Sequence, residues 1–223
     1  RSKGRPEAAP LVCSGKFNNA MRLTALDEFA EKLGLRKEQG VAEARAMFPA
    51  LDVLEEDPAA DRRLLEGIAD WCDRYTPMVA LDGKDGLFLD ITGCAHLFGG
   101  ERALLQDILS RLFHMGLDAR GAISSSPGLS WAVSRFGQGG VVDDEESERM
   151  LMPLPVAALR LEGQTVDALR KLGLKYVGDV IHAPRAPLTR RFGPALLLRL
   201  DQALGHEEEP ISPRLPVANL SSE

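Results

Sequence analysis

The chain has 223 residues, a formal net charge of −6, 44% hydrophobic residues and 27% charged residues. This composition is ordinary for a globular protein, and the length suffices for one large domain or two small ones. The acidic balance argues against a uniformly basic nucleic-acid-binding surface, and no apolar run reaches the roughly 18 residues of a membrane-spanning helix. The three cysteines (Cys13, Cys72 and Cys94) lack metal-binding spacing, which predicts reduced, buried thiols.

The first third of the chain predicts short strands between helices. Apolar runs predict strands at 11–14 and 51–54. Helical spacing predicts helices at 24–33, where Gly34 ends the pattern, and at 41–47. A longer helix is expected to begin at Asp57-Pro58 and to end near Thr76, because proline is favoured in the first turn.

The middle of the chain predicts a hairpin followed by two helices and a strand. The expected elements are strands at 78–81 and 87–92 around a turn at 82–86, a helix at 101–115, a strand at 119–123 and a helix at 127–136. The rings of Trp71 and Trp131 are expected in the core. This order of elements predicts an α+β fold, with helices on one face of a mixed sheet.

A change of composition at 137–148, glycine-rich and then acidic, predicts a domain boundary. Beyond it the pattern is helical. Helices are expected at 155–159, 165–172, 177–182, 186–192 and 194–204, and the proline-containing tail 207–223 is expected to be a linker. Residues 149–215 carry ten Lys and Arg against seven Asp and Glu, whereas residues 1–148 carry 17 against 25. Any phosphate contact is therefore expected in the last third.

The hairpin carries the most informative motif. Residues 85–92 read D-G-L-F-L-D-I-T, and residues 89–101 continue as L-D-I-T-G-C-A-H-L-F-G-G-E. The first segment resembles the palm segment D-E-A-Y-L-D-V-T of Y-family (translesion) DNA polymerases, the UmuC/DinB superfamily. The second is similar to the ImuB branch of that superfamily, which is regarded as inactive in polymerisation.

The resemblance extends over about residues 11–210 and implies a Y-family-like architecture. It implies a palm of mixed sheet and helices, small fingers, and an all-helical thumb with a helix-hairpin-helix-like motif. The implied divisions are a lead-in at 1–10, fingers at 11–74, palm at 75–148, thumb at 149–213, and a linker at 214–223 toward a little-finger domain outside this chain.

The catalytic positions of the family are degenerate here. The family holds magnesium with an Asp and the Glu beside it; these positions are Asp85 and Gly86. The family's other metal-binding Asp lies on a strand expected before this chain begins. Asp90 is five residues farther along the strand, so its side chain is expected on the opposite face from Asp85 and bound structurally at the strand end. The resemblance therefore predicts no catalytic residue, no metal and no cofactor, and Asp85 is interpreted as a turn residue.

Two further family features are missing. Aligned on Gly34, the helix that grips the triphosphate in the family carries Glu28 and Glu31 at its Tyr and Arg positions. A carboxylate facing a phosphate at 4 Å is repelled by about 4 kcal/mol at an effective dielectric of 20. The family's Asn-Lys pair corresponds to the stretch 124–128, which has no cation and is expected to be a loop with a helix cap.

The thumb motif is better preserved. Residues 161–174 resemble a helix-hairpin-helix, although its first glycine is replaced by Leu161. Such hairpins bind the DNA backbone with main-chain amides and nearby cations. The predicted backbone-binding residues are Gly163, Thr165, Lys171, Lys175, Arg190 and Arg191. Arg190 and Arg191 are equally compatible with a solvated surface.

The resemblance implies a non-catalytic adaptor in bacterial DNA-damage-induced mutagenesis. Its expected partners are the RecA-like ImuA protein, an error-prone C-family DNA polymerase and the sliding clamp, with weak non-specific DNA contact. The expected location is the cytoplasm, at the nucleoid, and the clamp-binding motif is expected beyond Glu223, in a longer protein. Two alternatives remain: an active translesion polymerase that holds metal with other carboxylates, and a DNA-binding module that acts through the thumb.

Overall fold

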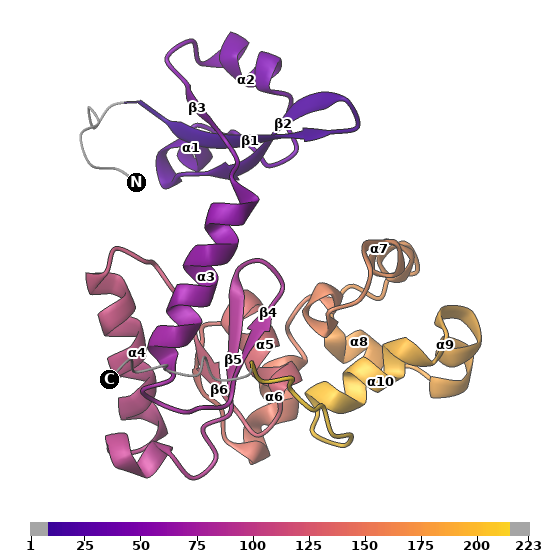
Figure 1. Cartoon of the computed structure of the whole chain (residues 1–223). Helices are drawn as coiled ribbons and strands as arrows, with labels where there is room; N and C mark the ends of the chain where they lie inside the picture. Colours follow the sequence, from indigo (N-terminus) through magenta and orange to yellow (C-terminus); the bar gives the residue numbers. More distant parts are fainter. Residues whose placement is uncertain (1–8, 215–223) are drawn as a thin grey trace, which may run out of the picture. The chain divides into compact units, whose positions relative to one another are not determined.

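The computed structural model describes residues 9–214, and the chain divides into two compact units between Leu64 and Leu65 (Figure 1). No helix in the described part of the chain is long and apolar enough to cross a membrane.

The first unit is built on a three-stranded sheet in the order β2-β1-β3. Strand β1 (Leu11–Phe17) pairs antiparallel with β2 (Ala20–Leu26) and parallel with β3 (Asp52–Glu55). The β1–β2 turn holds Asn18 and Asn19 at φ 46° and 62°, the left-handed conformation that a two-residue hairpin turn favours.

Helices α1 (Glu28–Lys32) and α2 (Val41–Met47) complete this unit. The buried core residues of the unit are Val12, Leu23, Ala30, Leu35, Ala44 and Leu51. The predicted strands at 11–14 and 51–54 and the helix at 41–47 are confirmed.

The helix predicted over 24–33 is wrong in its first part. Residues up to Leu26 belong to β2, and the helix begins only after Asp27, whose carboxylate accepts a hydrogen bond from Ala30 N at 2.7 Å. Pairing with β1 satisfies the main chain of this segment and overrides its local helical spacing, and the capping side chain of Asp27 then starts the helix.

Helix α3 (Pro58–Cys72) runs across the division between the units. It begins at Pro58 as predicted, and the Asp57 carboxylate accepts from Ala60 N at 2.9 Å. It ends earlier than predicted, and Tyr75 and Thr76 lie in the buried connection that follows it.

In the second unit, strands β4 (Val79–Asp82) and β5 (Gly86–Leu89) form the predicted antiparallel hairpin. After the short 3-10 turn η1 (Ala95–Phe98) come α4 (Glu101–His114), β6 (Ala122–Ile123), α5 (Pro127–Phe136) and β7 (Gly140–Val141). Strands β6 and β7 pair in parallel.

The mixture of helices and strands is as predicted, but the pairing differs from a single mixed sheet. The described strands form three separate ladders, and within the second unit β5 and β6 are not hydrogen-bonded to each other. Both strands instead line an open groove of about 1580 Å³, whose wall includes half-buried Leu105, Ile108 and Leu109 of α4.

The last third is helical, as predicted. It contains the 3-10 turns η2 (Asp144–Glu146) and η3 (Val156–Leu159), and the helices α6 (Ser147–Leu151), α7 (Gly163–Lys171), α8 (Val177–Ile181), α9 (Arg185–Phe192) and α10 (Pro194–Ala203).

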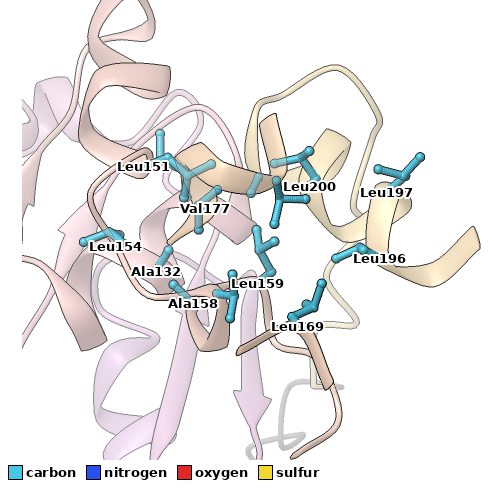
Figure 2. Close-up of a cluster of buried hydrophobic side chains, with 14 of the residues drawn as sticks. Ala132, Leu151, Leu154, Ala158, Leu159, Leu169, Val177, Leu196, Leu197 and Leu200 are labelled. Atoms are coloured by element: carbon cyan, nitrogen blue, oxygen red, sulfur yellow. The ribbon is translucent and has the colours of Figure 1, made fainter. Parts of the chain in front are cut away.

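One hydrophobic core joins this helical part to α5 (Figure 2). Leu129, Ala132 and Val133 of α5 pack with Leu159, Leu169, Leu200 and their buried neighbours. Helices α5 and α10 approach closely at Gly128, where an added Cβ would lie 2.9 Å from Ala203 Cα. The core therefore runs across the predicted boundary at 137–148. The fingers-like, palm-like and thumb-like divisions remain predictions.

The tail after α10 is bound to the body of the second unit, which corrects the linker prediction for residues 207–214. Glu209 forms ion pairs with Arg160 and with Arg199, the latter at 2.8 Å. Arg214 N donates to Val79 O at 2.8 Å, and the Arg214 guanidinium pairs with Asp70 and Asp73 of the α3 region. These ion pairs and the main-chain bond order the segment despite its prolines. The rest of the predicted linker, 215–223, lies outside the described residues, as does most of the lead-in at 1–10.

Candidate functional site

Two carboxylates lie together at the end of the β4–β5 hairpin. Asp82 ends β4 and is paired in register with Gly86, the first residue of β5. Gly83, at φ 59°, makes the tight turn between them and brings Asp85 back beside Asp82. The turn places both side chains on the groove between β5 and β6.

The same cation binds both carboxylates. The guanidinium of Arg135, in the last turn of α5, donates to Asp85 Oδ2 at 3.1 Å and to Asp85 Oδ1 at 2.8 Å. Its Nη2 also lies 3.5 Å from Asp82 Oδ2. We call Arg135, Asp82 and Asp85 the arginine clamp.

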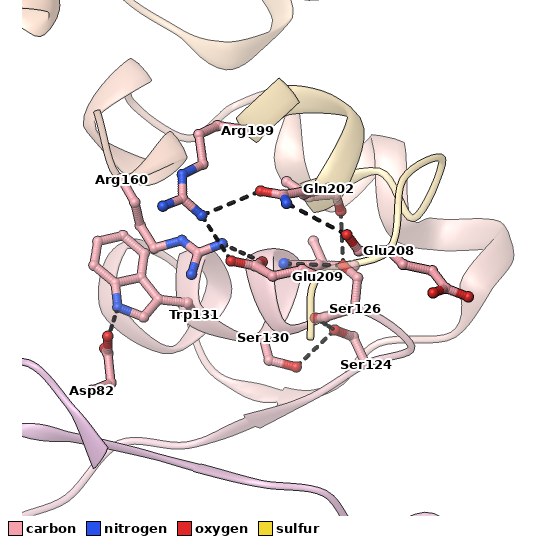
Figure 3. A network of polar contacts seen from close by, with 12 residues as sticks. Asp82, Ser124, Ser126, Ser130, Trp131, Arg160, Arg199, Gln202, Glu208 and Glu209 are labelled. Atoms are coloured by element: carbon pink, nitrogen blue, oxygen red, sulfur yellow. Dashed lines mark hydrogen bonds and ion pairs between the residues drawn. The ribbon is translucent and has the colours of Figure 1, made fainter. Parts of the chain in front are cut away.

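Trp131 supports the arginine clamp from the same face of α5, one turn earlier. Its indole Nε1 donates to Asp82 Oδ2 at 2.7 Å (Figure 3). The Arg135 guanidinium lies 4.9 Å from the centroid of the Trp131 ring. The cation–π contact and the ion pairs hold the guanidinium in one orientation. Trp131 is thus half-buried, and its indole N–H makes a polar contact, which corrects its predicted place in the core. Trp71 is also half-buried, but it packs against the buried residues Ala69, Cys72 and Val79, as predicted.

The electrostatics of the clamp are those of a satisfied ion pair. The hydrogen bonds to Asp85 raise the pKa of the Arg135 guanidinium above its ordinary value, burial opposes this, and the charges of Asp85 and Asp82 raise it further. The side chains of Arg135 and Asp82 are 30% and 26% exposed, whereas that of Asp85 is 71% exposed. The Asp82 contact is therefore the better shielded of the two.

Gly86 leaves the space that Arg135 fills. A Cβ at this position would lie 2.9 Å from Arg135 Nη2, 2.9 Å from Asp82 Oδ2 and 3.1 Å from Asp82 O. A glutamate at this position, as in the Y-family pattern, is incompatible with the arginine clamp as it stands.

Asp90 follows the last residue of β5 and has hydrogen-bond partners of its own. Its Oδ1 accepts from Thr92 N at 2.9 Å, and the hydrogen bonds from the Thr92 side chain and main chain lower the pKa of the Asp90 carboxyl. Thr76 Oγ1 donates to Asp90 O at 2.6 Å and ties the strand end to the buried connection after α3. This carboxylate is structural, as predicted.

The loop after β6 carries a helix cap, as expected for the stretch 124–128. Ser126 Oγ accepts from Leu129 N at 3.2 Å and donates to Ala203 O at 3.1 Å. No cation lies in this loop, but Arg135, two turns farther along α5, brings one to the hairpin. The sequence signal was the pair Trp131 and Arg135, four residues apart on one helix face.

Across residues 9–214, no group of three or more His, Cys, Asp or Glu side chains is placed to hold a metal ion. The clamp supplies two carboxylates, and both are engaged by Arg135. Magnesium takes oxygen ligands in near-octahedral geometry, so this pair is an incomplete donor set.

The predicted nucleotide-gripping positions lie in the first unit, on α1. Glu28 and Glu31 are both exposed, and Glu28 forms an ion pair with Lys32 at 3.1 Å. Both glutamates stand in the first turn of α1, where a carboxylate is favoured by the helix dipole.

The six predicted DNA-contacting residues are spread over the helical part. Gly163 and Thr165 lie at the start of α7 and Lys171 at its end, whereas Lys175 precedes α8 and Arg190 and Arg191 end α9. Thr165 is half-buried and the others are exposed. Their contact with a DNA backbone stays a prediction.

Sequence patterns did not predict the polar network behind the clamp. Arg160, which ends η3 in the left-handed conformation, stacks 5.8 Å from the Trp131 ring centroid and pairs with Glu209. Arg199 of α10 pairs with the same Glu209 and bonds Gln202 (Figure 3). The network links α5, η3, α10 and the tail, which are remote in sequence, and periodicity carries no information on such contacts.

Comparison with known proteins gives the chain a family context. The sequence model of the impB/mucB/samB family matches residues 4–135. Protein ImuB of Caulobacter vibrioides is 49% identical over 187 residues, which are 83% of this chain and 41% of that protein. DNA polymerase IV of Clostridium kluyveri is 25% identical over 215 residues, which are 94% of this chain and 53% of that protein. The chain therefore spans about half or less of the length of these relatives.

Solved structures show the same fold. DinB from Sulfolobus solfataricus superposes with a TM-score of 0.73 at 17% identity, over 92% of this chain and 62% of that chain. The insertion ternary complex of Dbh DNA polymerase superposes with a TM-score of 0.76 at 17% identity, over the same shares of the two chains.

Proposed function

Since the chain belongs to the impB/mucB/samB family, we propose that it is a non-catalytic, Y-family-like protein of the bacterial DNA-damage response. Its proposed role is that of an adaptor in translesion synthesis. The strong similarity to Protein ImuB supports this branch of the family over the more distant DNA polymerase IV relatives.

The observation that carries the proposal is the state of the hairpin. At the position of the family's second metal-binding carboxylate stands Gly86, and the remaining carboxylate, Asp85, is bound by Arg135. Two-metal nucleotidyl transfer needs clustered oxygen ligands and a site open to the triphosphate. A hairpin with two carboxylates held by a guanidinium offers neither.

The first unit supports the same conclusion. If α1 meets the triphosphate as its family counterpart does, it presents Glu28 and Glu31, and these like charges oppose binding.

The proposed partners follow from the resemblance to the ImuB branch. They are a RecA-like protein of the ImuA type, an error-prone C-family polymerase and the sliding clamp, assembled in the cytoplasm at the nucleoid. The proposed DNA contact is weak and sequence-independent, because the exposed cations of the helical part reach phosphates only.

Primer extension tests the absence of catalysis. The chain, alone and within a longer form that has the length of its ImuB relatives, is incubated with primed template, all four dNTPs and Mg²⁺ or Mn²⁺. We expect no incorporation above a protein-free control. Template-dependent incorporation that Asp85→Ala abolishes would contradict the proposal.

Co-purification from DNA-damaged cells tests the adaptor role. The tagged longer form is expected to retain a RecA-like protein and a C-family polymerase after nuclease treatment. If the partners are lost with nuclease, DNA bridges them and the adaptor role fails. The DNA-binding-module alternative would then be favoured by the basic excess of residues 149–215.

A further inference from the structure

Residues 207–214, which follow α10 and which we call the strap, are anchored first at Glu209. The Glu209 carboxylate forms ion pairs with Arg160 and Arg199. The side chains of Glu209 and Arg160 are only 11% and 15% exposed. An ion pair that is shielded from water is screened little by salt, and loss of one partner leaves the other charge without compensation. Glu209 is therefore a firm anchor.

The second anchor of the strap, Arg214, is more exposed. Its guanidinium lies 2.5 Å from Asp70 Oδ1 and 3.3 Å from Asp73 Oδ1, and the side chains of these carboxylates are 52% and 41% exposed. Exposed ion pairs contribute little to stability and are screened by salt. Arg214 Nε is buried and has no hydrogen-bond partner among residues 9–214, which costs free energy when the side chain docks. The Arg214 end is therefore the more easily released of the two.

The strap covers part of the β4–β5 hairpin. Arg214 N donates to Val79 O of β4 at 2.8 Å, and within residues 9–214 this is the one main-chain hydrogen bond between the strap and β4. Pro210 and Pro213 have no N–H with which to continue such pairing. Ile211 lines the groove between β5 and β6. The strap thus closes over a strand edge and a groove wall without becoming part of the sheet.

From this asymmetry we propose that the strap is a lid, hinged at Glu209 and latched by Arg214. Release of the Arg214 guanidinium frees residues 211–214 while Glu209 stays paired. The open lid takes Ile211 out of the groove wall and frees the Val79 carbonyl on the edge of β4, where an extended segment of chain can pair. The lid does not depend on the role proposed above, because its opening is measurable without DNA, nucleotide or partner proteins.

Amide hydrogen exchange of the whole chain, read by mass spectrometry with single-residue fragmentation, measures the opening. Arg214→Gln keeps the main-chain amide but loses the ion pairs, so exchange at residue 214 should be roughly tenfold faster than in the wild type. The Glu207 amide, which donates to Asp201 O at 3.3 Å on the hinge side of the strap, should exchange at an unchanged rate. Glu209→Gln should accelerate exchange at both positions, because the weaker anchor alone does not hold the strap.

A salt series tests the latch in the unaltered chain. Raising the ionic strength from about 0.1 M to 1 M shortens the Debye length from about 10 Å to 3 Å. Exchange at residue 214 should then accelerate in the wild type and stay constant in Arg214→Gln, in which the ion pairs are already lost. Ser212→Ala, at an exposed position of the strap, is the control and should match the wild type at both ionic strengths.

Two results would overturn the proposal. If residue 214 exchanges at the same rate in Arg214→Gln and in the wild type, and salt leaves the wild-type rate unchanged, the guanidinium is not a latch. If Arg214→Gln accelerates exchange at Glu207 as much as at residue 214, the strap opens as a whole and Glu209 is not a hinge.

Discussion

The second unit carries cations in two regions, the β4–β5 hairpin and the helical part. The cation at the hairpin is paired with carboxylates, whereas four cations of the helical part are exposed. At the hairpin, Arg135 is bound by Asp82 and Asp85. On the helical part, Lys171, Lys175, Arg190 and Arg191 are exposed, and within residues 9–214 no carboxylate lies at ion-pair distance from any of them. A guanidinium already bound by carboxylates is not available to an external anion, whereas exposed, unpaired cations remain available.

The difference distinguishes the hairpin, where the family's catalytic positions lie, from the exposed surface of the helical part. The hairpin keeps the backbone geometry of a family whose members include polymerases, but its charges are satisfied within the chain. The cations Lys171, Lys175, Arg190 and Arg191 of the helical part are exposed, and their contact with a DNA backbone is part of the proposed function. Helix α5 connects the two regions, since its polar face carries Trp131 and Arg135 and its apolar face carries Leu129 and Val133.

The largest expected effect tests whether the two regions share one core. Leu159→Ala, at 1% exposure in the core of Figure 2, should lower the free energy of unfolding by about 2–5 kcal/mol. In a Trp71→Phe background, urea unfolding followed by Trp131 fluorescence and by helical circular dichroism should give one coincident transition. A helical transition at lower urea, with the Trp131 signal unchanged, would show that the regions unfold separately.

The next effect concerns the tail. Glu209→Gln leaves Arg160 and Arg199 without their shared carboxylate, and the Glu209 side chain is only 11% exposed. The expected loss is about 1.5–3 kcal/mol in the free energy of unfolding, the range for hydrogen bonds to charged groups. Glu207→Gln, at an exposed position in the same segment, is the control and should stay within roughly 0.5 kcal/mol of the wild type. If Glu209→Gln and Glu207→Gln lower the free energy of unfolding by similar amounts, the ion pairs of Glu209 do not stabilise the tail.

The contrast between bound and unbound cations predicts a difference within α9. Replacing Arg190 and Arg191 together by Ala should weaken DNA binding and reduce the slope of log K against log salt by up to about 2, because each phosphate contact contributes roughly one. Arg185→Ala in the same helix should leave the slope unchanged, because Arg185 is already paired with Asp201. Fluorescence anisotropy of labelled duplex over a salt series measures both. If Arg185→Ala reduces the slope as much as the double substitution does, pairing with a carboxylate does not decide which cations contact DNA.

The smallest expected effect is pH-dependent. The pKa of Asp90 is lowered in the folded chain by its hydrogen bonds from Thr92, so its ionised form stabilises the fold. This contribution is fully present above the unfolded pKa of roughly 3.9 and is lost as the pH falls through the lower folded value. Urea unfolding at pH 5 and pH 3 should therefore show a smaller acid-induced loss in Asp90→Asn than in the wild type. If Asp90→Asn and the wild type lose the same free energy of unfolding between pH 5 and pH 3, the ionised Asp90 carboxylate does not stabilise the fold.

Most helices and strands were predicted from the spacing of apolar residues and from the residues that bound each segment. The hairpin, α4, α5 and the helices α7 to α10 were predictable because each carries apolar residues at its own period and is bounded by proline, glycine or a capping side chain. Helix α6 (Ser147–Leu151) was not predicted. The segment 24–33 was mispredicted because strand pairing with β1 outweighs a helical spacing of four apolar residues.

The sequence by itself determined the family resemblance, the loss of the carboxylate at Gly86 and the exposed charges of α7 to α9, because these depend on residue identity and on short spacings. Only the tertiary structure decided that Arg135 binds both hairpin carboxylates, that Trp131 links them to Arg160, and that Glu209 holds the tail. Most of these contacts join residues about 50 positions apart, and the orientation of a side chain across such a distance is set by the packing of α5 against its neighbours. The local spacing of apolar residues does not predict that packing.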